Sequence, residues 1–320
     1  MRKSMLVLIA GILSLTVPAL AGPLAKEQVS CGANWLVHVD VEQFRSTRMC
    51  EVVRPELENL GIEKKLSDFA ALFSFHPIDD IRDVTIYGED QDREKAVALI
   101  EAVFDKQKLL ALLGIAPEHE EIKYGDLVLH KWVDESKKDC DGAGQTTYCC
   151  FYEDDLIVIG AGLDGVKHAV DVLKGSAANA ANIVFSQATE GAKGVFFQVM
   201  ANNIRQTVGD HPKAAVLRQA DRFALAAGEI EGKFYIDFLL TAKSEEVAQA
   251  INKIVDGIIA FATLAGEEDP KLAELAARVD LSCQQNIVHV HFDSDPACVV
   301  KFLIERCECP SEIVEEILKP

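Results

Sequence analysis

Two stretches of this chain follow the same order of strands and helices, and this internal repeat constrains the fold more than any other feature. Residues 36–45, LVHVDVEQFR, match residues 196–205, FFQVMANNIR, because both are alternating apolar strands that run into a polar helix start. Residues 83–89, DVTIYGE, match residues 223–229, FALAAGE, because both are strands that end in Gly-Glu. The chain is therefore expected to contain one supersecondary unit twice.

Each unit is expected to continue with two hairpins and a closing helix. Asp105 and Ser244 are the expected N-caps of the helices between the hairpins. The expected hairpins pair residues 83–89 with 96–104, 126–133 with 148–159, 223–229 with 233–241 and 277–283 with 286–292, and the closing helices span 163–173 and 296–306. Tight turns make neighbouring strands antiparallel. The predicted fold class is α+β, with two tandem repeats of strand-helix-hairpin-helix-hairpin-helix and helices on one face of antiparallel sheets.

The first residues have the features of a signal peptide. Arg2 and Lys3 form a basic start, residues 5–17 are apolar, and Ala19-Leu20-Ala21 supplies a small-x-small cleavage pattern. The predicted division is a signal peptide over residues 1–21, a first repeat over 22–180 and a second over 181–320, packed separately or as one body. The leader is expected to be cleaved or, alternatively, retained as an anchor, and no later stretch is expected to span a membrane. The predicted location is exported, either periplasmic or extracellular.

The charge balance excludes some partners. The chain has 51 acidic and 32 basic residues, which gives a formal charge of −19. Such a field repels phosphate backbones and anionic headgroups. We therefore expect no nucleic acid and no strong membrane-surface binding apart from the leader, and the expected partner is a protein or a small ligand.

Two histidines in the segment NIVHVHFDSDP, residues 286–296, are candidate metal ligands. His289 and His291 alternate with apolar residues that suit a core, so they are expected to point outward from a strand, and so are His38 and Asp40 in LVHVDV. If the two strands lay side by side, these four side chains could hold a zinc ion. A solvated sheet face explains the same alternation and is the preferred interpretation. No cofactor is predicted.

The nine cysteines are many for an exported chain, and structural disulfides are their expected role. Because the number is odd, at least one cysteine is expected to be free or paired between chains. The adjacent Cys149 and Cys150 are expected to point to opposite faces of a strand. The nine are Cys31, Cys50, Cys140, Cys149, Cys150, Cys283, Cys298, Cys307 and Cys309.

The whole chain resembles a group of exported bacterial proteins of unknown function, in which a duplicated α+β unit follows a signal peptide. The resemblance rests on the leader, LVHVDVEQFRSTRM, DVTIYGE, YGDLVLHKW and GVKHAVDVLKG. It implies no activity, cofactor or site residue.

Signatures of three common catalytic sites, G-x-S-x-G, G-x-x-x-x-G-K-[ST] and H-E-x-x-H, are absent from the sequence. The preferred interpretation is an exported, non-catalytic binding or structural protein of the bacterial envelope. One alternative is a metal-dependent enzyme that uses the His/Asp cluster, and another is a lipid or lipoprotein carrier in which a sheet curves over an apolar cavity.

Overall fold

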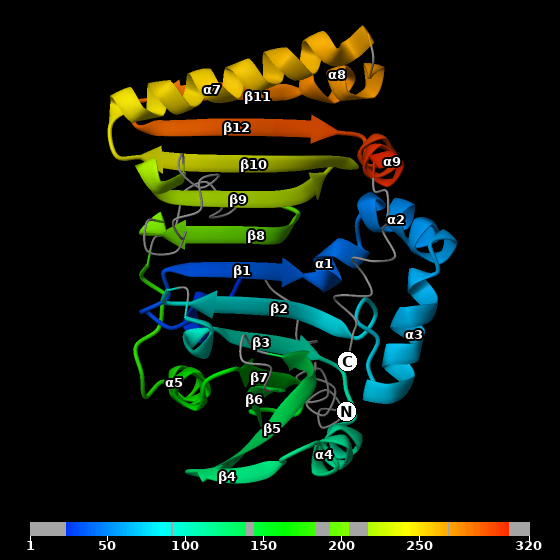
Figure 1. Ribbon diagram of the computed structural model, residues 1–320, viewed down its shortest axis with the longest axis vertical. Helices are drawn as coiled ribbons and strands as arrows, with labels where there is room; N and C mark the ends of the chain where they lie inside the picture. The colour runs from blue at the N-terminus through cyan, green and yellow to red at the C-terminus, as the bar shows by residue number, and fades with distance from the viewer. Residues whose placement is uncertain are drawn as a thin grey trace, which may run out of the picture.

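The computed structural model describes residues 24–90, 92–138, 144–183, 193–204, 217–267 and 269–306. Its strands form one 12-stranded sheet in the order β11-β12-β10-β9-β8-β1-β2-β3-β7-β6-β5-β4 (Figure 1). Every neighbouring pair is antiparallel. The α+β class with antiparallel pairing is therefore confirmed, whereas the predicted signal peptide lies outside the described residues.

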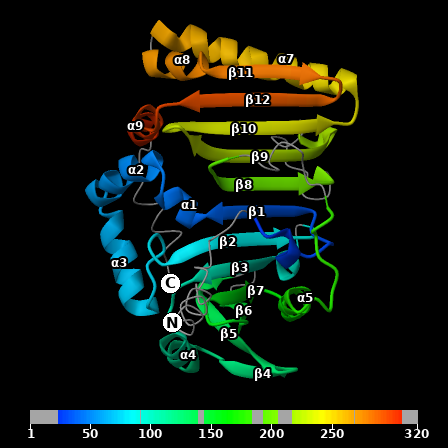
Figure 2. The same ribbon diagram turned by 180° about the vertical axis from the view of Figure 1, so that it is seen from behind.

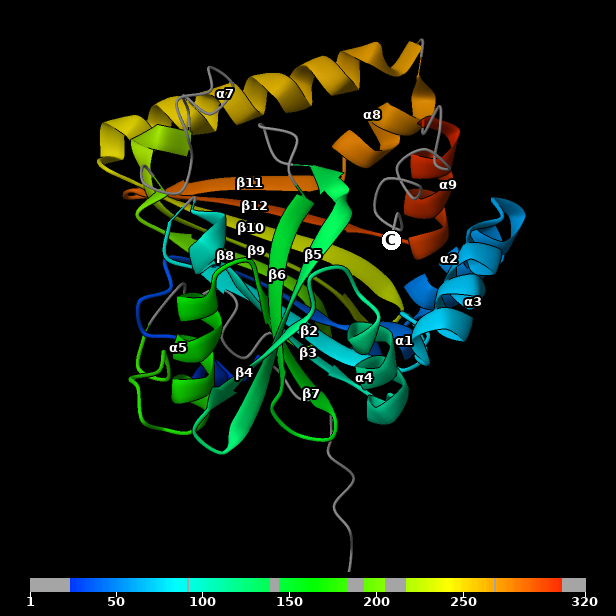
Figure 3. The same cartoon turned by 60° about the horizontal axis from the view of Figure 1, so that its bottom comes forward.

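The strands are β1 Trp35–Asp40, β2 Ile81–Gly88, β3 Val97–Ala102, β4 Glu120–Tyr124, β5 Leu127–Lys138, β6 Gly144–Phe151, β7 Leu156–Gly160, β8 Val195–Asn202, β9 Ala220–Ile230, β10 Lys233–Ala242, β11 Val279–Gln284 and β12 Ile287–Ser294. The helices are α1 Val41–Arg45, α2 Arg48–Asn59, α3 Ile62–Phe73, α4 Lys106–Gly114, α5 Leu163–Leu173, α7 Glu245–Leu264, α8 Pro270–Ala276 and α9 Pro296–Arg306. In Figure 3 the sheet is strongly curved, with β5 and β6 at a steep angle to β10 and β12.

The strand β1 pairs with β8 at the centre of the sheet. From this pair the order runs β1-β2-β3-β7-β6 in one direction and β8-β9-β10-β12-β11 in the other. The sheet is continuous across the predicted boundary between the two repeats. The tandem duplication itself remains a prediction.

Helices cover both faces of the sheet, which corrects the prediction of helices on one face. In β7, Ile157 packs in the cluster that contains Leu109 of α4, whereas its neighbour Val158 packs in the cluster that contains Val166 of α5. Successive strand residues point to opposite faces, so α4 and α5 lie on opposite sides of β7. A strand that is apolar on both faces needs cover on both. In Figures 1 and 2, α5 lies at the opposite end of the strands from α2, α3 and α9.

The predicted second hairpin of the first repeat is also corrected. Residues 148–159 do not form one strand, because the chain turns after Phe151 and returns as β7. The strand β6 pairs with both β5 and β7, and β5 forms a further hairpin with β4. The Glu153-Asp154-Asp155 segment marks this turn in the sequence. Because the residues on either side of it are apolar, the two strands were predicted as one.

Helix starts were predicted well because their chemistry is local. The Asp105 carboxylate accepts a hydrogen bond from the Lys108 amide, and the Ser244 hydroxyl accepts one from the Val247 amide. A non-local contact of the same kind holds α2: Glu229 of β9 accepts hydrogen bonds from the amides of Arg48 and Met49, each at 2.8 Å. A carboxylate at a helix N-terminus is stabilising, so Glu229 joins the two halves of the chain.

The cysteines with described positions are all unpaired, namely Cys31, Cys50, Cys149, Cys150, Cys283 and Cys298. Disulfides among these six, expected from the sequence, are absent. Cys149 and Cys150 pack in different clusters on opposite faces of β6, as predicted. Both are buried, so their thiols fill the core as small apolar groups. Cys140, Cys307 and Cys309 lie outside the described residues.

Candidate functional site

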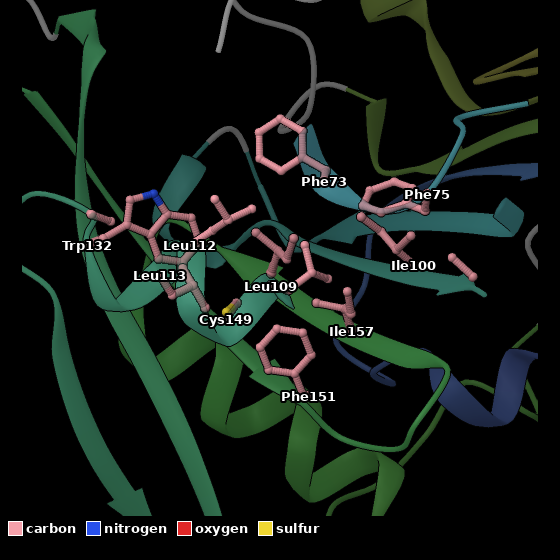
Figure 4. A pocket seen from close by; sticks show the side chains of 13 residues that line it. Phe73, Phe75, Ile100, Leu109, Leu112, Leu113, Trp132, Cys149, Phe151 and Ile157 are labelled. Atoms are coloured by element: carbon pink, nitrogen blue, oxygen red, sulfur yellow. The ribbon is translucent and has the colours of Figure 1, made fainter. Parts of the chain in front are cut away.

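An apolar cavity of about 260 Å³ lies between α3, α4 and the strands β3, β5, β6 and β7, and is partly open to the outside (Figure 4). Its lining contains no ionisable group other than one thiol. The 13 lining residues are Phe73, Phe75, Ile100, Ala102, Leu109, Leu112, Leu113, Ala116, Trp132, Cys149, Phe151, Ile157 and Ile159.

Local sequence explains why this hollow is apolar. Helix α4 places leucines at positions 109, 112 and 113, and the spacing of three and four residues directs them to one face. The strand residues Ile157 and Ile159 are two apart, so they share the face that α4 covers. Phe73 and Phe75 extend the wall at the end of α3, where Phe69 contacts the Phe73 ring in a tilted arrangement and the Phe75 ring edge to face. The cavity wall therefore consists of packed core side chains.

The single thiol in the wall is unsuited to nucleophilic chemistry. Burial raises the pKa of Cys149 to about 12, with a smaller contribution from the adjacent Cys150. The thiolate is the reactive form of cysteine. Cys149 therefore stays protonated at neutral pH and acts as part of an apolar surface.

A cation lies beside one wall of the cavity. The Lys106 Nζ atom is 5.9 Å from the centre of the Phe151 ring. Lys106 also forms an ion pair with Asp154, at 3.8 Å between Nζ and Oδ1, and the Asp154 side chain is fully exposed. Because exposed ion pairs contribute little, Lys106 can exchange this partner for another anion.

A second cluster, of two histidines and one aspartate, lies on the other half of the sheet. Asp237 of β10 is the direct cross-strand partner of His291 of β12, and His289 shares the same face two residues earlier. The Asp237 Oδ1 atom is 2.8 Å from His289 Nε2 and 2.9 Å from His291 Nδ1. The two histidine side chains are 40% and 36% exposed. The prediction that both point outward is confirmed.

His38 and Asp40 do not join this cluster. Three strands, β8, β9 and β10, separate β1 from β12, and neighbouring strands are about 4.8 Å apart. Both residues are buried rather than outward-facing, which corrects that expectation. His38 Nδ1 is 2.9 Å from Thr85 Oγ1, and Asp40 accepts a hydrogen bond from the Gln43 amide at the start of α1. Alternation alone could not reveal partners that let polar side chains be buried.

The sequence analysis missed Asp237, and although one of its alternatives was a sheet curved over an apolar cavity, it named none of the residues that line the cavity. Asp237 is a lone acid within the apolar strand segment FYIDFLL, and a predicted register between β10 and β12 would have placed it opposite His291. The segment FAALFSF contains three phenylalanines at the end of α3. This concentration of aromatic residues was the available signal for the cavity wall.

Helix α7 presents an apolar stripe to solvent in addition to the face that packs on the sheet. Ile254, Ile258, Phe261 and Leu264 are all exposed, and they recur every three or four residues. By length and composition alone, this 20-residue helix could cross a membrane. The sequence analysis expected no such segment after the leader.

The segment GAGLDG, residues 160–165, matches the dinucleotide-binding spacing G-x-G-x-x-G between β7 and α5, a match that the sequence analysis missed. The structure explains its glycines by packing. A Cβ atom on Gly162 would lie 2.1 Å from the Glu94 carbonyl oxygen, and one on Gly165 would lie 2.8 Å from it. The neighbouring strands are antiparallel, so no βαβ unit is formed, and the Glu94 backbone packs directly against the glycines.

Ser30 and His168 also meet without forming a catalytic triad. Ser30 Oγ lies 3.0 Å from His168 Nε2, and the serine is buried. A triad needs a third group to orient the histidine. Among the residues that the structure describes, no carboxylate is hydrogen-bonded to His168.

Of the comparisons with known proteins, only the one with solved structures gave matches. No family model matches the chain. No curated protein matches it either. Among solved structures, crystal form III of TP0453, a Treponema pallidum protein, is 8% identical with a TM-score of 0.49, over 89% of this chain and 99% of that one. Crystal form I of TP0453 is 8% identical with a TM-score of 0.45, over 89% of this chain and 98% of that one.

Proposed function

We propose that this chain is an exported, non-catalytic protein of the bacterial envelope that binds the apolar part of a small amphiphile in the cavity between α4 and the strands β3, β5, β6 and β7. One observation carries the proposal: a partly open cavity whose wall consists almost entirely of aliphatic and aromatic side chains. Removing apolar surface from water is favourable, so an apolar chain gains free energy when it packs against such a wall.

The size and surroundings of the cavity favour an acyl chain with an anionic head. A volume of about 260 Å³ exceeds the roughly 150 Å³ of an apolar cavity that accommodates benzene. The Lys106 ammonium beside Phe151 can attract a carboxylate at the end of the chain. A monocarboxylic fatty acid is therefore a suitable probe.

A non-catalytic role fits the chemistry of the wall. The Cys149 thiol, protonated because burial raises its pKa to about 12, is its only nucleophile. The proposed export rests on the leader, and with it the proposed periplasmic or extracellular location. The sequence analysis left the partner open between a protein and a small ligand, and we propose a small amphiphile.

We further propose that the two halves arose by duplication. Support comes from the matching strand orders on either side of the β1–β8 pair. The closing helices differ, because α5 packs in the cluster of Val158 whereas α9 packs with Phe292 on the opposite face. The two halves also differ in their candidate sites, because one half contains the cavity and the other contains the Asp237 cluster. We therefore propose that the halves diverged after the duplication.

The proposal predicts that a charge in the wall weakens binding. Leu113→Asp places a carboxylate in the cavity lining, and an unpaired charge there repels an apolar chain and a carboxylate head. We expect dodecanoic acid to bind the unmodified protein with one molecule per chain in isothermal titration calorimetry. The Leu113→Asp variant should bind at least about 10-fold more weakly, a difference of about 1.4 kcal/mol.

Ile115→Asp is the matched control, because Ile115 follows the same helix but is 82% exposed. It adds the same charge without entering the cavity and should leave the affinity unchanged. Equal weakening by both variants would show that net charge, and not the cavity, governs the binding. Absence of binding to the unmodified protein would refute the proposed function.

A further inference from the structure

The cluster of Asp237, His289 and His291 has the composition and geometry of a metal site. The ligand atoms of these three residues all lie within 4.8 Å of one another. Two imidazole nitrogens and one carboxylate oxygen are the ligand set that three-residue zinc sites use, with an open position for water or substrate. We propose that these three side chains bind a divalent transition-metal ion, with Zn²⁺ as the ion that the donor set suits best.

The distances require only a small adjustment. Zinc bonds of about 2.0–2.1 Å in tetrahedral geometry place neighbouring ligand atoms about 3.3 Å apart. The Asp237 Oδ1 atom is now 2.8 Å from His289 Nε2 and 2.9 Å from His291 Nδ1. Both imidazoles already direct a nitrogen toward one carboxylate oxygen, so opening each pair by a few tenths of an ångström makes room for the ion.

The scaffold holds the three ligands on rigid elements. Asp237 and His291 face each other across the β10–β12 ladder, and His289 is fixed two residues away on the same strand face. The Tyr235 ring stacks on the His291 ring, with 6.5 Å between centroids and 23° between planes. The Tyr235 hydroxyl in turn donates a hydrogen bond to the Lys193 carbonyl oxygen at 2.9 Å. This support limits rotation of one imidazole, as partners of metal-binding histidines commonly do.

The site is open enough to complete the coordination of the ion. A hollow of about 360 Å³ adjoins Asp237 and His291, which leaves space for a water molecule in the fourth position. Two further acids are near: Asp293 lines the same hollow, and Asp280 of β11 is the cross-strand partner of His291. Asp280 adds negative charge that favours a cation, whereas the charge of Asp293 is offset by its ion pair with Lys233, at 3.8 Å between Nζ and Oδ2. Imidazole ligands select zinc and related ions over Ca²⁺ and Mg²⁺, which prefer oxygen.

The other histidine cluster in the described part of the chain provides the matched control. His119 Nε2 lies 3.2 Å from His130 Nδ1, with Glu121 close by. The two rings are stacked, with only 11° between their planes. His130 is only 5% exposed, which leaves little room for the water molecule that would complete the coordination, so this cluster is not expected to hold the ion.

The test uses Co²⁺, which replaces zinc and reports its ligands by absorption. A chelator first removes any metal from the protein, which is then titrated with Co²⁺. In a second experiment the metal-free protein is dialysed against Zn²⁺ and the bound metal is measured. We expect one ion per chain, visible bands of nitrogen and oxygen coordination, and no near-ultraviolet band from thiolate. The Asp237→Ala and His289→Ala/His291→Ala variants should bind at least about 100-fold more weakly, since even the loss of a residue that hydrogen-bonds to a metal ligand costs about 10–100-fold.

The His119→Ala/His130→Ala variant should bind Co²⁺ as the unmodified protein does. Circular dichroism and urea unfolding of each variant without metal check that the sheet is intact, and Asp237→Asn, which keeps the shape, replaces Asp237→Ala if the latter is unfolded. Binding that survives in the Asp237 and His289/His291 variants would overturn the proposal. A thiolate band would overturn it as well, because it would assign the ion to cysteines, and so would an unmodified protein that binds no Co²⁺.

Discussion

Replacing Val288 by aspartate is expected to lower the free energy of unfolding by about 3–5 kcal/mol, because it leaves an unpaired charge in a core. Val288 is 1% exposed and packs in the cluster that contains Leu240 of β10 and Ile251 of α7. It faces Leu240 directly across the β10–β12 ladder. The side chains in contact with it are apolar and cannot satisfy a carboxylate. Urea unfolding followed by circular dichroism measures the loss.

The adjacent position gives a matched control, because Ile287 is also β-branched but is 39% exposed on the other face of β12. Ile287→Asp should cost less than about 1 kcal/mol, and so should His289→Ala, as surface changes usually do. A cost for Ile287→Asp as large as that for Val288→Asp would contradict the assignment of the buried face of β12.

A second large effect is expected from Asp83→Asn, and it depends on pH. Asp83 is 8% exposed and lies between Asp40 of β1 and Glu101 of β3 as cross-strand neighbours. Burial, and then the negative charges of Glu101 and Asp40, raise the pKa of Asp83 to about 7. Above that pH the folded chain must hold a desolvated carboxylate beside two others. Asparagine has the same shape without the charge.

The direction of the pH dependence follows from proton binding. Between the ordinary carboxyl pKa of about 4 and the folded value of about 7, the folded chain keeps a proton that the unfolded chain has lost. This proton stabilises the fold at low pH, and the stabilisation disappears as the pH rises through that window. The advantage of Asp83→Asn over the unmodified protein should therefore grow from about pH 4 and reach on the order of 2–4 kcal/mol above pH 7.

His38 acts in the opposite direction on the same face of the sheet. Burial lowers the pKa of His38 to about 4, so between that value and about 6.5 only the unfolded chain binds the proton. His38 therefore adds stability as the pH rises through this window, and it offsets Asp83 in the unmodified protein. The Asp83→Asn variant loses the opposing effect of Asp83 but keeps that of Asp40, whose pKa burial also raises. Between about pH 4 and 6.5 its stability should therefore rise more steeply with pH than that of the unmodified protein.

Urea unfolding at a series of pH values between 4 and 8 measures how the free energy of unfolding changes with pH. Asp221→Asn, at an exposed position of β9, serves as the control and should show no such growth. The free energies of unfolding of the Asp83→Asn variant and the unmodified protein should differ by an amount that changes with pH. A difference that is constant across this pH range would contradict the buried, protonated state of Asp83.

The sequence predicted local features correctly where the cause is local. The helix α5 begins and ends at the predicted residues, and the Asp105 and Ser244 caps accept the expected bonds. Features that depend on distant strands were not predicted. The face that β1 buries depends on its position between β2 and β8, and the alternation of LVHVDV gave the opposite face.

The candidate sites show the same limit. His289 and His291 were identified because they lie on one strand, but their partner Asp237 is 52 and 54 residues away and was missed. The cavity brings together residues from the end of α3 to β7. Each of these apolar residues is by itself an ordinary core residue, and only the curvature of the sheet and the placing of α4 leave space between them.

The most direct test of the central claim locates the bound chain at one wall of the cavity. The protein has two tryptophans: Trp132 lines the cavity, whereas Trp35 of β1 packs against the cluster of Leu240. Bromine quenches indole fluorescence on contact, so brominated stearic acid should quench the Trp35→Phe protein, in which only Trp132 remains. The same titration should leave the Trp132→Phe protein, in which only Trp35 emits, unquenched. Equal quenching of the two proteins, or quenching of neither, would contradict binding in the cavity.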